Sequence, residues 1–313
     1  MTSEVLEKVK GCNLCPRQCK ADRTGNMRGI CGETNTIRAA RAALHKWEEP
    51  CISGTRGSGT VFFTGCSLKC VFCQNRNISG GIVGKEITEE RLSDIFLELS
   101  QKGANNINLV TPTHFIPGIV KAIEKARTKG LNLPIVYNCG GYESIQGLKM
   151  LDGLVDVYLP DMKYFSSELS LRYSGAEDYF ERACESLDEM FRQVGTPEFS
   201  DGKGSCEKGI MTKGMIVRHL LLPGGLSDSR KVISYLYERF GDNIYISIMN
   251  QYTPMKSVTD TDSLYPELGR KVTDEEYDAL VDYAIEIGIE NGFIQEGETA
   301  KESFIPDFDM EGI

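Results

Sequence analysis

The sequence lacks three features that would place it in large classes of protein. No stretch of about 18 apolar residues occurs, so we expect no membrane span. The first ten residues, MTSEVLEKVK, mix charges and lack the apolar segment of about 7–15 residues that a signal peptide needs. A long basic run is also missing, and 35 Lys and Arg against 45 Asp and Glu give a formal net charge of −10. Because nucleic-acid binding needs clustered basic residues, we expect neither a nucleic-acid nor a membrane partner.

Internal repeats and low-complexity tracts are missing too, and 41% hydrophobic with 26% charged residues is ordinary for a globular protein. The unusual component is cysteine, with eleven residues. Without a secretory signal, the expected compartment is a reducing cytoplasm. There, cysteines are interpreted as metal ligands or free thiols rather than as a disulfide framework.

Three sections are distinguished along the chain. Residues 1–58 are rich in Cys, Arg and Gly, and we interpret them as a metal-binding extension. Residues 59–250 alternate short apolar runs with segments of helical spacing. Residues 251–313 begin in a polar loop, continue with one amphipathic helix and a strand at 291–296, and form a C-terminal extension expected to pack on the preceding section.

The middle section predicts alternating strands and helices. Six runs rich in β-branched or aromatic residues predict buried strands at 59–65, 106–110, 134–138, 155–160, 215–222 and 243–248. Helical spacing occurs at 88–103, 117–130, 176–195 and 227–241, each segment ending near a glycine. Thr88 and Ser227 are the expected N-caps of the first and last of these helices.

This alternation indicates a parallel sheet with crossover helices. Six strands are too few for a closed eight-stranded barrel. We therefore predict an α/β fold: a partial, open (β/α)6 TIM-like barrel with a Cys-rich N-terminal extension and a C-terminal helix/strand appendage. In such folds the chemistry gathers at the carboxyl ends of the strands.

The stretch GCSLKCVFCQN follows the first predicted strand and contains Cys66, Cys70 and Cys73 in the spacing C-x3-C-x2-C. Three thiolates can bind zinc with an open position, or three irons of a [4Fe–4S] cluster with the fourth iron free. The compact loop favours the cluster, because catalytic zinc sites draw ligands from distant segments. A closed zinc site that borrows Cys51 is the structural alternative.

Four further cysteines lie near the N-terminus, at Cys12, Cys15, Cys19 and Cys31, in the spacing C-x2-C-x3-C-x11-C. We call residues 12–31 the cassette. Four thiols within 20 residues predict a second metal site, with a disulfide pair as the alternative. Zinc and [4Fe–4S] both accept four thiolates, and the spacing does not decide between them.

The motif C-x3-C-x2-C, with Phe72 before its last cysteine, resembles the signature of the radical S-adenosylmethionine (SAM) superfamily. Together with CNLCPRQCKADRTG, NINLVTPTHF and VRHLLLPG, it is similar to the pyruvate formate-lyase activating enzyme-like subgroup that carries an N-terminal four-cysteine cassette. The resemblance spans roughly residues 10 to 250.

The resemblance implies a radical SAM oxidoreductase of the activating-enzyme-like kind. Its [4Fe–4S] cluster would be held by Cys66, Cys70 and Cys73, with SAM on the fourth iron. Reductive cleavage of SAM would form a 5′-deoxyadenosyl radical that abstracts hydrogen from a protein or peptide substrate, as in the activation of a glycyl-radical enzyme. An electron donor such as flavodoxin or ferredoxin is the implied partner.

The resemblance also implies a SAM pocket at the strand ends. Asn138-Cys139 departs from the family's Asp-Thr turn and removes a negative charge, so a cation site seen in relatives does not carry over. Thr111 and Thr113 stand where relatives hold the amino group of SAM. The residues implied in cofactor binding are Phe72, Thr111, Thr113, Asn138, Asp161, Lys163 and Arg218.

Other residues have two interpretations from the sequence. His114 could face substrate, but a lone histidine at a helix start is more often packed. His219 alternates with Arg218 on a strand and should lie under a helix. Asn250 and Gln251 could touch the adenine or ribose of SAM. Two alternative functions stay open: radical modification of a small molecule, sugar or ribosomal peptide, and a zinc-binding interaction module.

Overall fold

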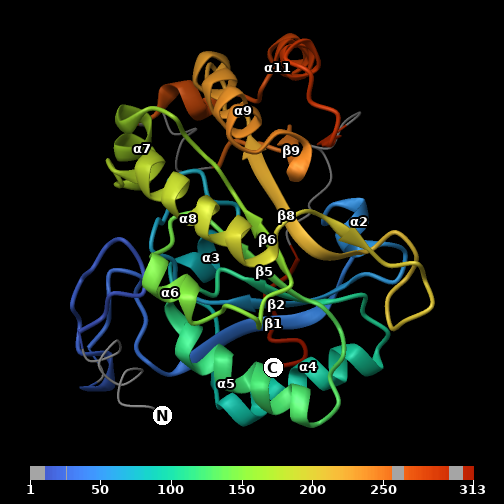
Figure 1. Ribbon diagram of the computed structural model, residues 1–313. Helices are drawn as coiled ribbons and strands as arrows, with labels where there is room; N and C mark the ends of the chain where they lie inside the picture. The colour runs from blue at the N-terminus through green and yellow to red at the C-terminus, as the bar shows by residue number, and fades with distance from the viewer. Residues whose placement is uncertain (1–10, 26, 256–263, 296–305) are drawn as a thin grey trace.

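A computed structural model describes residues 11–25, 27–255, 264–295 and 306–313 (Figure 1). Its centre is one curved sheet. The strands along its main path are, in spatial order, β10 (Gly292–Ile294), β9 (Tyr245–Met249), β8 (Met211–Leu220), β6 (Val157–Pro160), β5 (Ile135–Cys139), β4 (Ile107–Val110), β2 (Ser58–Phe63), β1 (Ile37–His45) and β3 (Lys85–Ile87). A short β7 (Glu198–Phe199) pairs with β8 off this path.

The sheet is parallel from β10 to β2, and β1 and β3 add two antiparallel strands. All six predicted strands are present, as β2, β4, β5, β6, β8 and β9. The path ends at β10 on one side and at β3 on the other. The predicted open, partial TIM-like barrel is therefore confirmed, with additional strands at both edges.

Helices connect the parallel strands on the outer face. They are α4 (Glu89–Gln101), α5 (Ile116–Thr128), α6 (Ile145–Lys149), α7 (Ser167–Ser174), α8 (Tyr179–Val194), α9 (Leu226–Phe240) and α11 (Asp274–Glu286). Short helices are α2 (Pro50–Ser53), α3 (Arg76–Ser79) and the 3-10 turns at Arg23–Gly25, Thr113–Phe115, Gly241–Asn243 and Pro266–Gly269. Figure 1 shows α4 and α5 side by side below β1 and β2, and α11 against α9.

The four predicted helices are confirmed as α4, α5, α8 and α9. Thr88 caps α4, because its hydroxyl accepts a hydrogen bond from the Arg91 N–H. The N-cap prediction for Ser227 is wrong, since α9 begins at Leu226 and its N-cap is Gly225. Gly224 adopts a left-handed conformation, with φ of +74°, in the turn before α9. The Gly225 N–H donates to Leu222 O at 2.9 Å, which places the start of the helix before Ser227.

Strand β1 was not predicted, and it lies within the section 1–58. It pairs antiparallel with β2 from Ala39↔Phe63 to His45↔Ser58. The sheet therefore begins before residue 59. Its sequence, IRAARAALH, holds few β-branched or aromatic residues, so the local signal for a strand is weak. The alanines suit a strand that is covered closely on both faces, and Ala39 and Ala40 are fully buried.

The barrel lumen is filled at the end where the parallel strands begin. The segment after β1 turns into the lumen and forms α2 there. Cys51 and Ile52 of α2 pack in one apolar cluster with Val136, Val157 and Ile216 from β5, β6 and β8. We call residues 46–53 the plug segment. It closes one end of the lumen and leaves space between itself and the loop after β2.

The described C-terminal part consists of α11, β10 and residues 306–313. The expected helix and strand are present as α11 and β10. Residues 306–313 lie along β1, where the Ala42 N–H donates to Glu311 O at 2.8 Å and the Met310 N–H donates to Ala40 O at 3.0 Å. Within the described residues, no helix has both the length and the apolar character needed to cross a membrane.

Candidate active site

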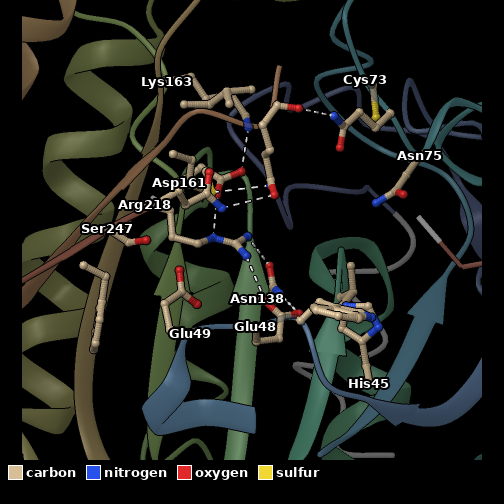
Figure 2. Close-up of a pocket in the computed structure, with 18 of the residues that line it drawn as sticks. His45, Glu48, Glu49, Cys73, Asn75, Asn138, Asp161, Lys163, Arg218 and Ser247 are labelled. Carbon is tan, nitrogen blue, oxygen red and sulfur yellow. Dashed lines mark hydrogen bonds and ion pairs between the residues drawn. The ribbon is translucent and has the colours of Figure 1, made fainter. Parts of the chain in front are cut away.

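A cavity of about 340 Å³ lies inside the barrel, between the plug segment and the loop after β2 (Figure 2). Residues from both edges of the open barrel reach it: His45 of β1 on one side, Phe293 and Ile294 of β10 on the other. Among its walls are Glu48, Glu49, Cys70, Phe72, Cys73, Asn138, Asp161, Lys163, Arg218 and Ser247. The cavity is therefore bounded by strand ends, as the fold predicts.

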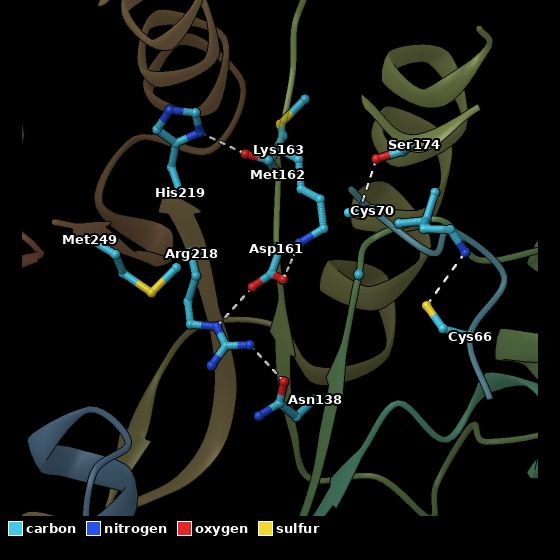
Figure 3. Close-up of polar contacts among 12 residues, drawn as sticks. Cys66, Cys70, Asn138, Asp161, Met162, Lys163, Ser174, Arg218, His219 and Met249 are labelled. Atoms are coloured by element: carbon cyan, nitrogen blue, oxygen red, sulfur yellow. Dashed lines mark hydrogen bonds and ion pairs between the residues drawn. The ribbon is translucent and has the colours of Figure 1, made fainter. Parts of the chain in front are cut away.

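Cys66, Cys70 and Cys73 lie on the loop after β2, which we call the cluster loop (residues 64–75). Gly65 begins it with φ of +79°, and a Cβ there would lie 2.4 Å from Cγ of Glu33, so only glycine fits. The Leu68 N–H donates to Sγ of Cys66 at 3.4 Å. The Ser174 hydroxyl donates to Sγ of Cys70 at 3.0 Å (Figure 3).

The three thiols are neighbours in a dry environment. Burial, together with the nearby Cys70 and Cys73, raises the pKa of Cys66 to about 12. Burial and Cys70 also raise the pKa of Cys73, while Lys163 opposes that rise. Metal binding would displace the thiol protons. Three adjacent thiols on one short loop, with a lysine beside them to offset negative charge, fit the three-thiolate cradle of a [4Fe–4S] cluster.

An ion-pair group joins three strand ends in front of the cluster loop (Figure 3). Arg218 of β8 donates to Oδ1 of Asp161 at 2.9 Å and to Oδ1 of Asn138 at 2.6 Å. Lys163 donates to Oδ2 of Asp161 at 2.6 Å. Burial opposes ionisation of Asp161, but Arg218 and Lys163 together hold its pKa below the ordinary value. Four predicted residues, of which Asn138 and Arg218 are 80 positions apart, are thus brought together.

Two acidic residues of the plug segment complete this group, and the sequence did not single them out. Oε2 of Glu48 accepts from Arg218 at 3.1 Å, and its Oε1 accepts from Asn108 at 3.0 Å and Asn138 at 3.2 Å. Glu49 lies beside Ser247 and Arg218. Burial raises the pKa of both carboxyls. The only sequence signal was an acidic pair directly before a helix-starting proline, which is common on surfaces.

The other residues predicted to bind the cofactor, Phe72, Thr111 and Thr113, differ in their position relative to the cavity. Phe72 lines the cavity and meets the rings of Tyr164, Tyr173 and Tyr252 edge-on. Thr111 follows β4 with φ of +58°, an unusual value for a β-branched residue, and its N–H donates to Asn138 O. Thr113 is buried and donates to Oε1 of Glu143 at 2.8 Å, away from the cavity walls.

The two histidines considered from the sequence are both packed. His114 is buried, and its Nε2 donates to Thr64 O at 2.6 Å, behind the cluster loop. Burial lowers the pKa of His114 to about 3, so it is neutral at physiological pH and does not face the cavity. His219 donates from Nδ1 to Met162 O at 2.7 Å, and its Nε2 is hydrogen-bonded to the Ser229 hydroxyl of α9 at 2.8 Å. The packed interpretation is confirmed for both.

Of the remaining residues considered from the sequence, some line the cavity and others do not. Gln251 lines the cavity, whereas Asn250 is not among its walls. Cys51 packs in the plug segment, at the end of the lumen opposite the cluster loop, so it does not close a site with the three loop thiols. Cys139 is buried at the end of β5, and Cys184 packs against the main core from α8.

The cassette thiols gather beside the cluster loop. Sγ of Cys19 and Sγ of Cys31 both lie against Gly29, and Arg23 reaches Sγ of Cys12 at 3.8 Å. Burial raises the pKa of Cys15 to about 12, with Cys12 and Cys31 adding to the rise. All eleven cysteines are free thiols. Across the part of the chain that is described, no three His, Cys, Asp or Glu residues enclose a single metal ion, so the second metal site stays a prediction.

The chain resembles known proteins in sequence and in fold. Residues 60–200 match the family model of the Radical SAM superfamily. The uncharacterized protein MJ0674 of Methanocaldococcus jannaschii is 27% identical over 290 residues, covering 90% of this chain and 76% of that protein. Among solved structures, Streptococcus suis SuiB bound to precursor peptide SuiA has a TM-score of 0.49 and 12% identity, covering 75% of this chain and 47% of that chain.

A second solved structure, native anSMEcpe with bound AdoMet, has a TM-score of 0.47 and 12% identity, covering 72% of this chain and 57% of that chain. The chain thus spans about half the length of these solved structures. The matched residues 60–200 contain the cluster loop, Asn138, Asp161 and Lys163. This segment of the chain therefore resembles the radical SAM superfamily.

Proposed function

We propose that the protein binds a [4Fe–4S] cluster through Cys66, Cys70 and Cys73 and uses it to cleave SAM reductively. When bound, such a cluster supplies the electron that breaks a C–S bond of SAM and releases a 5′-deoxyadenosyl radical, which abstracts hydrogen from the substrate. The observation that carries this proposal is a loop of three neighbouring thiols, two of which, on Cys70 and Cys73, line a cavity that is also walled by Asp161, Lys163 and Arg218.

The chain's own residues would bind and orient SAM. Lys163 lies near the thiols of Cys70 and Cys73, so its ammonium group is available to the carboxylate of SAM. Asp161 orients that lysine, because its Oδ2 accepts from Lys163 while its Oδ1 accepts from Arg218. Polar atoms of Thr111 would accept from the amino group of SAM. Phe72, within its ring of tyrosines, would exclude water from the cluster loop.

The substrate that we propose is a protein or peptide, as in glycyl-radical activation. The sheet does not close, since its path ends at β3 on one side and at β10 on the other, and the cavity reaches residues of β1 and β10. A backbone segment could therefore enter from the side rather than through a narrow opening. A flavodoxin or ferredoxin would supply the electron, and free thiols throughout favour a reducing, cytoplasmic location.

The cassette would hold a second metal centre, zinc or iron–sulfur. The support is the gathering of Cys12, Cys15, Cys19 and Cys31 in one buried region without disulfides. Anaerobic iron, sulfide and zinc analysis separates the possibilities. About four irons per chain indicate one cluster and about eight indicate two, whereas zinc with no sulfide rejects the radical chemistry.

The central test uses anaerobically reconstituted protein with SAM and dithionite. The wild-type chain is expected to form 5′-deoxyadenosine, and Cys73→Ala is expected to reduce the product by at least about a hundredfold, because one iron loses its ligand. Cys184→Ala, a cysteine of α8 outside the cavity, is the matched control and should keep the activity. No 5′-deoxyadenosine from the wild-type protein with any reductant would refute the proposal.

Radical modification of a small molecule is the second candidate, favoured by the closed, polar end of the cavity at the plug segment. Deuterium transfer into 5′-deoxyadenosine from labelled candidates separates the two. Label from a glycyl-radical enzyme or a peptide supports the first, and label from a metabolite alone supports the second.

A further inference from the structure

Glu48 and Glu49 form an acidic floor of the cavity, at the end away from the cluster loop. They follow β1, whose His45 pairs with Ser58, the first residue of β2, while the cluster loop follows the last residue of β2. The two ends of this six-residue strand are about 17 Å apart. Figure 2 shows Glu48 and Glu49 on one side of Arg218, with Lys163 and Cys73 on the other.

The charges of this group do not balance. Three carboxylates, on Glu48, Glu49 and Asp161, face two cations. Lys163 pairs with Asp161, and Arg218 pairs with Asp161 and Glu48. Among the residues described, these pairs leave Glu49 without a cation of its own, although its side chain is about nine-tenths buried. An isolated buried carboxylate is costly, so Glu49 either takes up a proton, in the direction of its raised pKa, or ionises when a cationic partner binds beside it.

Two buried oxygen atoms in the same group lack a hydrogen-bond partner among the described residues: Oε2 of Glu49 and Oδ1 of Asn108. Asn108 cannot be turned to correct this, because its amide nitrogen donates to Oε1 of Glu48. Both unpaired atoms are acceptors, so what is missing is a donor. Buried polar atoms nearly always have partners, and Glu49 is the one of these two residues that lines the cavity and that an N–H group of a bound ligand can contact.

We propose that Glu49, supported by Glu48, binds an ammonium or guanidinium group of the substrate. This inference rests on the proposed function and names the substrate class: a compound with an alkylammonium or alkylguanidinium arm, such as a lysine or arginine side chain of a peptide. The charged head would occupy the acidic floor and replace the missing cation. Its carbons would then extend toward the cluster end of the cavity.

The walls above the floor suit such an arm. His45, Phe62 and Phe293 line the cavity on its open side, where they offer ring faces and edges to an alkyl stem and its cationic head. The whole molecule adds a general attraction, because its formal net charge is −10. A neutral side chain of the same length would bring no positive charge to the Glu49 carboxylate.

The test measures binding rather than turnover. Reconstituted full-length protein with SAM and no reductant is titrated with N-acetyl-lysine N-methylamide and with its uncharged counterpart, N-acetyl-norleucine N-methylamide, at low ionic strength, and Kd is followed by NMR. The wild type is expected to prefer the lysine compound by about tenfold or more, as a charge-assisted contact in a dry site should. Glu49→Gln should reduce the preference to about twofold or less.

Two further variants test whether misfolding or a general loss of negative charge explains the result. Glu49→Asp keeps the charge and should keep part of the preference, which separates loss of charge from misfolding. Glu177→Gln removes one exposed carboxylate outside the cavity and should keep all of it.

The proposal is overturned if the wild type shows no preference for the lysine compound, or if Glu49→Gln retains it. It is also overturned if Glu49→Gln weakens SAM and the lysine compound equally, since the carboxylate would then serve the cofactor. Because no reductant is used, these outcomes are independent of 5′-deoxyadenosine formation. A protein that binds the lysine compound but never cleaves SAM would refute the proposed function alone.

Discussion

At the residue scale, Glu143 shows how burial sets the protonation state of a carboxyl that the sequence does not distinguish. Its two oxygens accept from the Thr113 hydroxyl at 2.8 Å and the Tyr137 hydroxyl at 3.0 Å. Burial raises its pKa from 4.5 to about 7, with these hydrogen bonds opposing the rise. Glu143 is therefore largely protonated in the folded protein at pH 6.

This shift predicts a pH dependence of stability. Because the folded state holds the Glu143 proton more tightly than the unfolded chain, the free energy of unfolding should fall as pH rises from about 5 to about 7. The rise from 4.5 to about 7 corresponds to about 3 kcal/mol at most. Glu143→Gln should flatten this part of the profile, as measured by urea unfolding at several pH values.

Glu124→Gln in α5, whose carboxyl lies at the protein surface, is the matched control for that experiment and should keep the wild-type slope. An unchanged slope in Glu143→Gln would mean that another buried group governs stability in this range.

At the element scale, the cassette is joined directly to the cluster loop. The Cys66 N–H donates to Cys31 O at 3.1 Å, so the first loop cysteine is held by the last cassette cysteine. Arg17 of the cassette donates to Ser67 O at 3.0 Å and to Ser174 O at 2.7 Å. Since the Ser174 hydroxyl in turn donates to Sγ of Cys70, one arginine supports the loop from two sides.

Arg17→Met should therefore loosen the cluster loop without touching a metal ligand. Loss of these hydrogen bonds is expected to reduce the free energy of unfolding by about 1–3 kcal/mol. In reconstituted protein, iron release to a chelator should become several times faster. The measurements are urea unfolding and the time course of absorbance loss.

Arg28→Met is the matched control for Arg17→Met, because Arg28 of the cassette donates to Gly32 O, directly after the cassette, and not to the cluster loop. Equal rates of iron release in the two variants would contradict a special role for Arg17.

At the scale of the whole molecule, the C-terminal residues 306–313 cover part of β1. Residues 306–313 bond to its backbone, the Phe308 ring packs against Phe62 at 5.5 Å, and Asp309 pairs with Arg41 at 2.7 Å. Beyond Ala39, where the pairing with β3 ends, this segment takes the exposed edge of β1. Exposed strand edges promote association between molecules, so covering them has a physical purpose.

A chain that stops at residue 305 should be less stable and should self-associate. Loss of two backbone hydrogen bonds and of the Phe308 contact is expected to cost about 2–4 kcal/mol. Urea unfolding measures the loss, and light scattering measures association.

The full-length variant Asp307→Asn removes an exposed charge of the same segment and should behave as wild type. A truncated chain that stays monomeric with unchanged stability would show that β1 does not need this cover.

Much of the barrel was predictable because its signals are local. Each of the six parallel strands and the four long helices carries its periodicity within about ten to twenty residues. The cluster loop was equally clear, since C-x3-C-x2-C is contained in eight residues. Predicted residues at separate strand ends, Asn138, Asp161, Lys163 and Arg218, do meet, because carboxyl ends of parallel strands share one edge.

The missed features depend on contacts that no local pattern records. Strand β1 is alanine-rich and is identified by its partner β2 rather than by its own composition. Thr113 looked like a neighbour of SAM, but the turn after β4 directs its hydroxyl to Glu143. Ser227 looked like a cap, but α9 begins before it.

The sequence by itself determined the order of strands and helices, the open parallel barrel and the three-thiol loop, because each follows from periodicity or spacing within one short segment. Only the tertiary structure decided what lies opposite that loop. Glu48 and Arg218 are 170 positions apart, and they meet because the plug segment folds back into the lumen. The unpaired carboxyl of Glu49, and with it the expected charge of the substrate, follows from that fold alone.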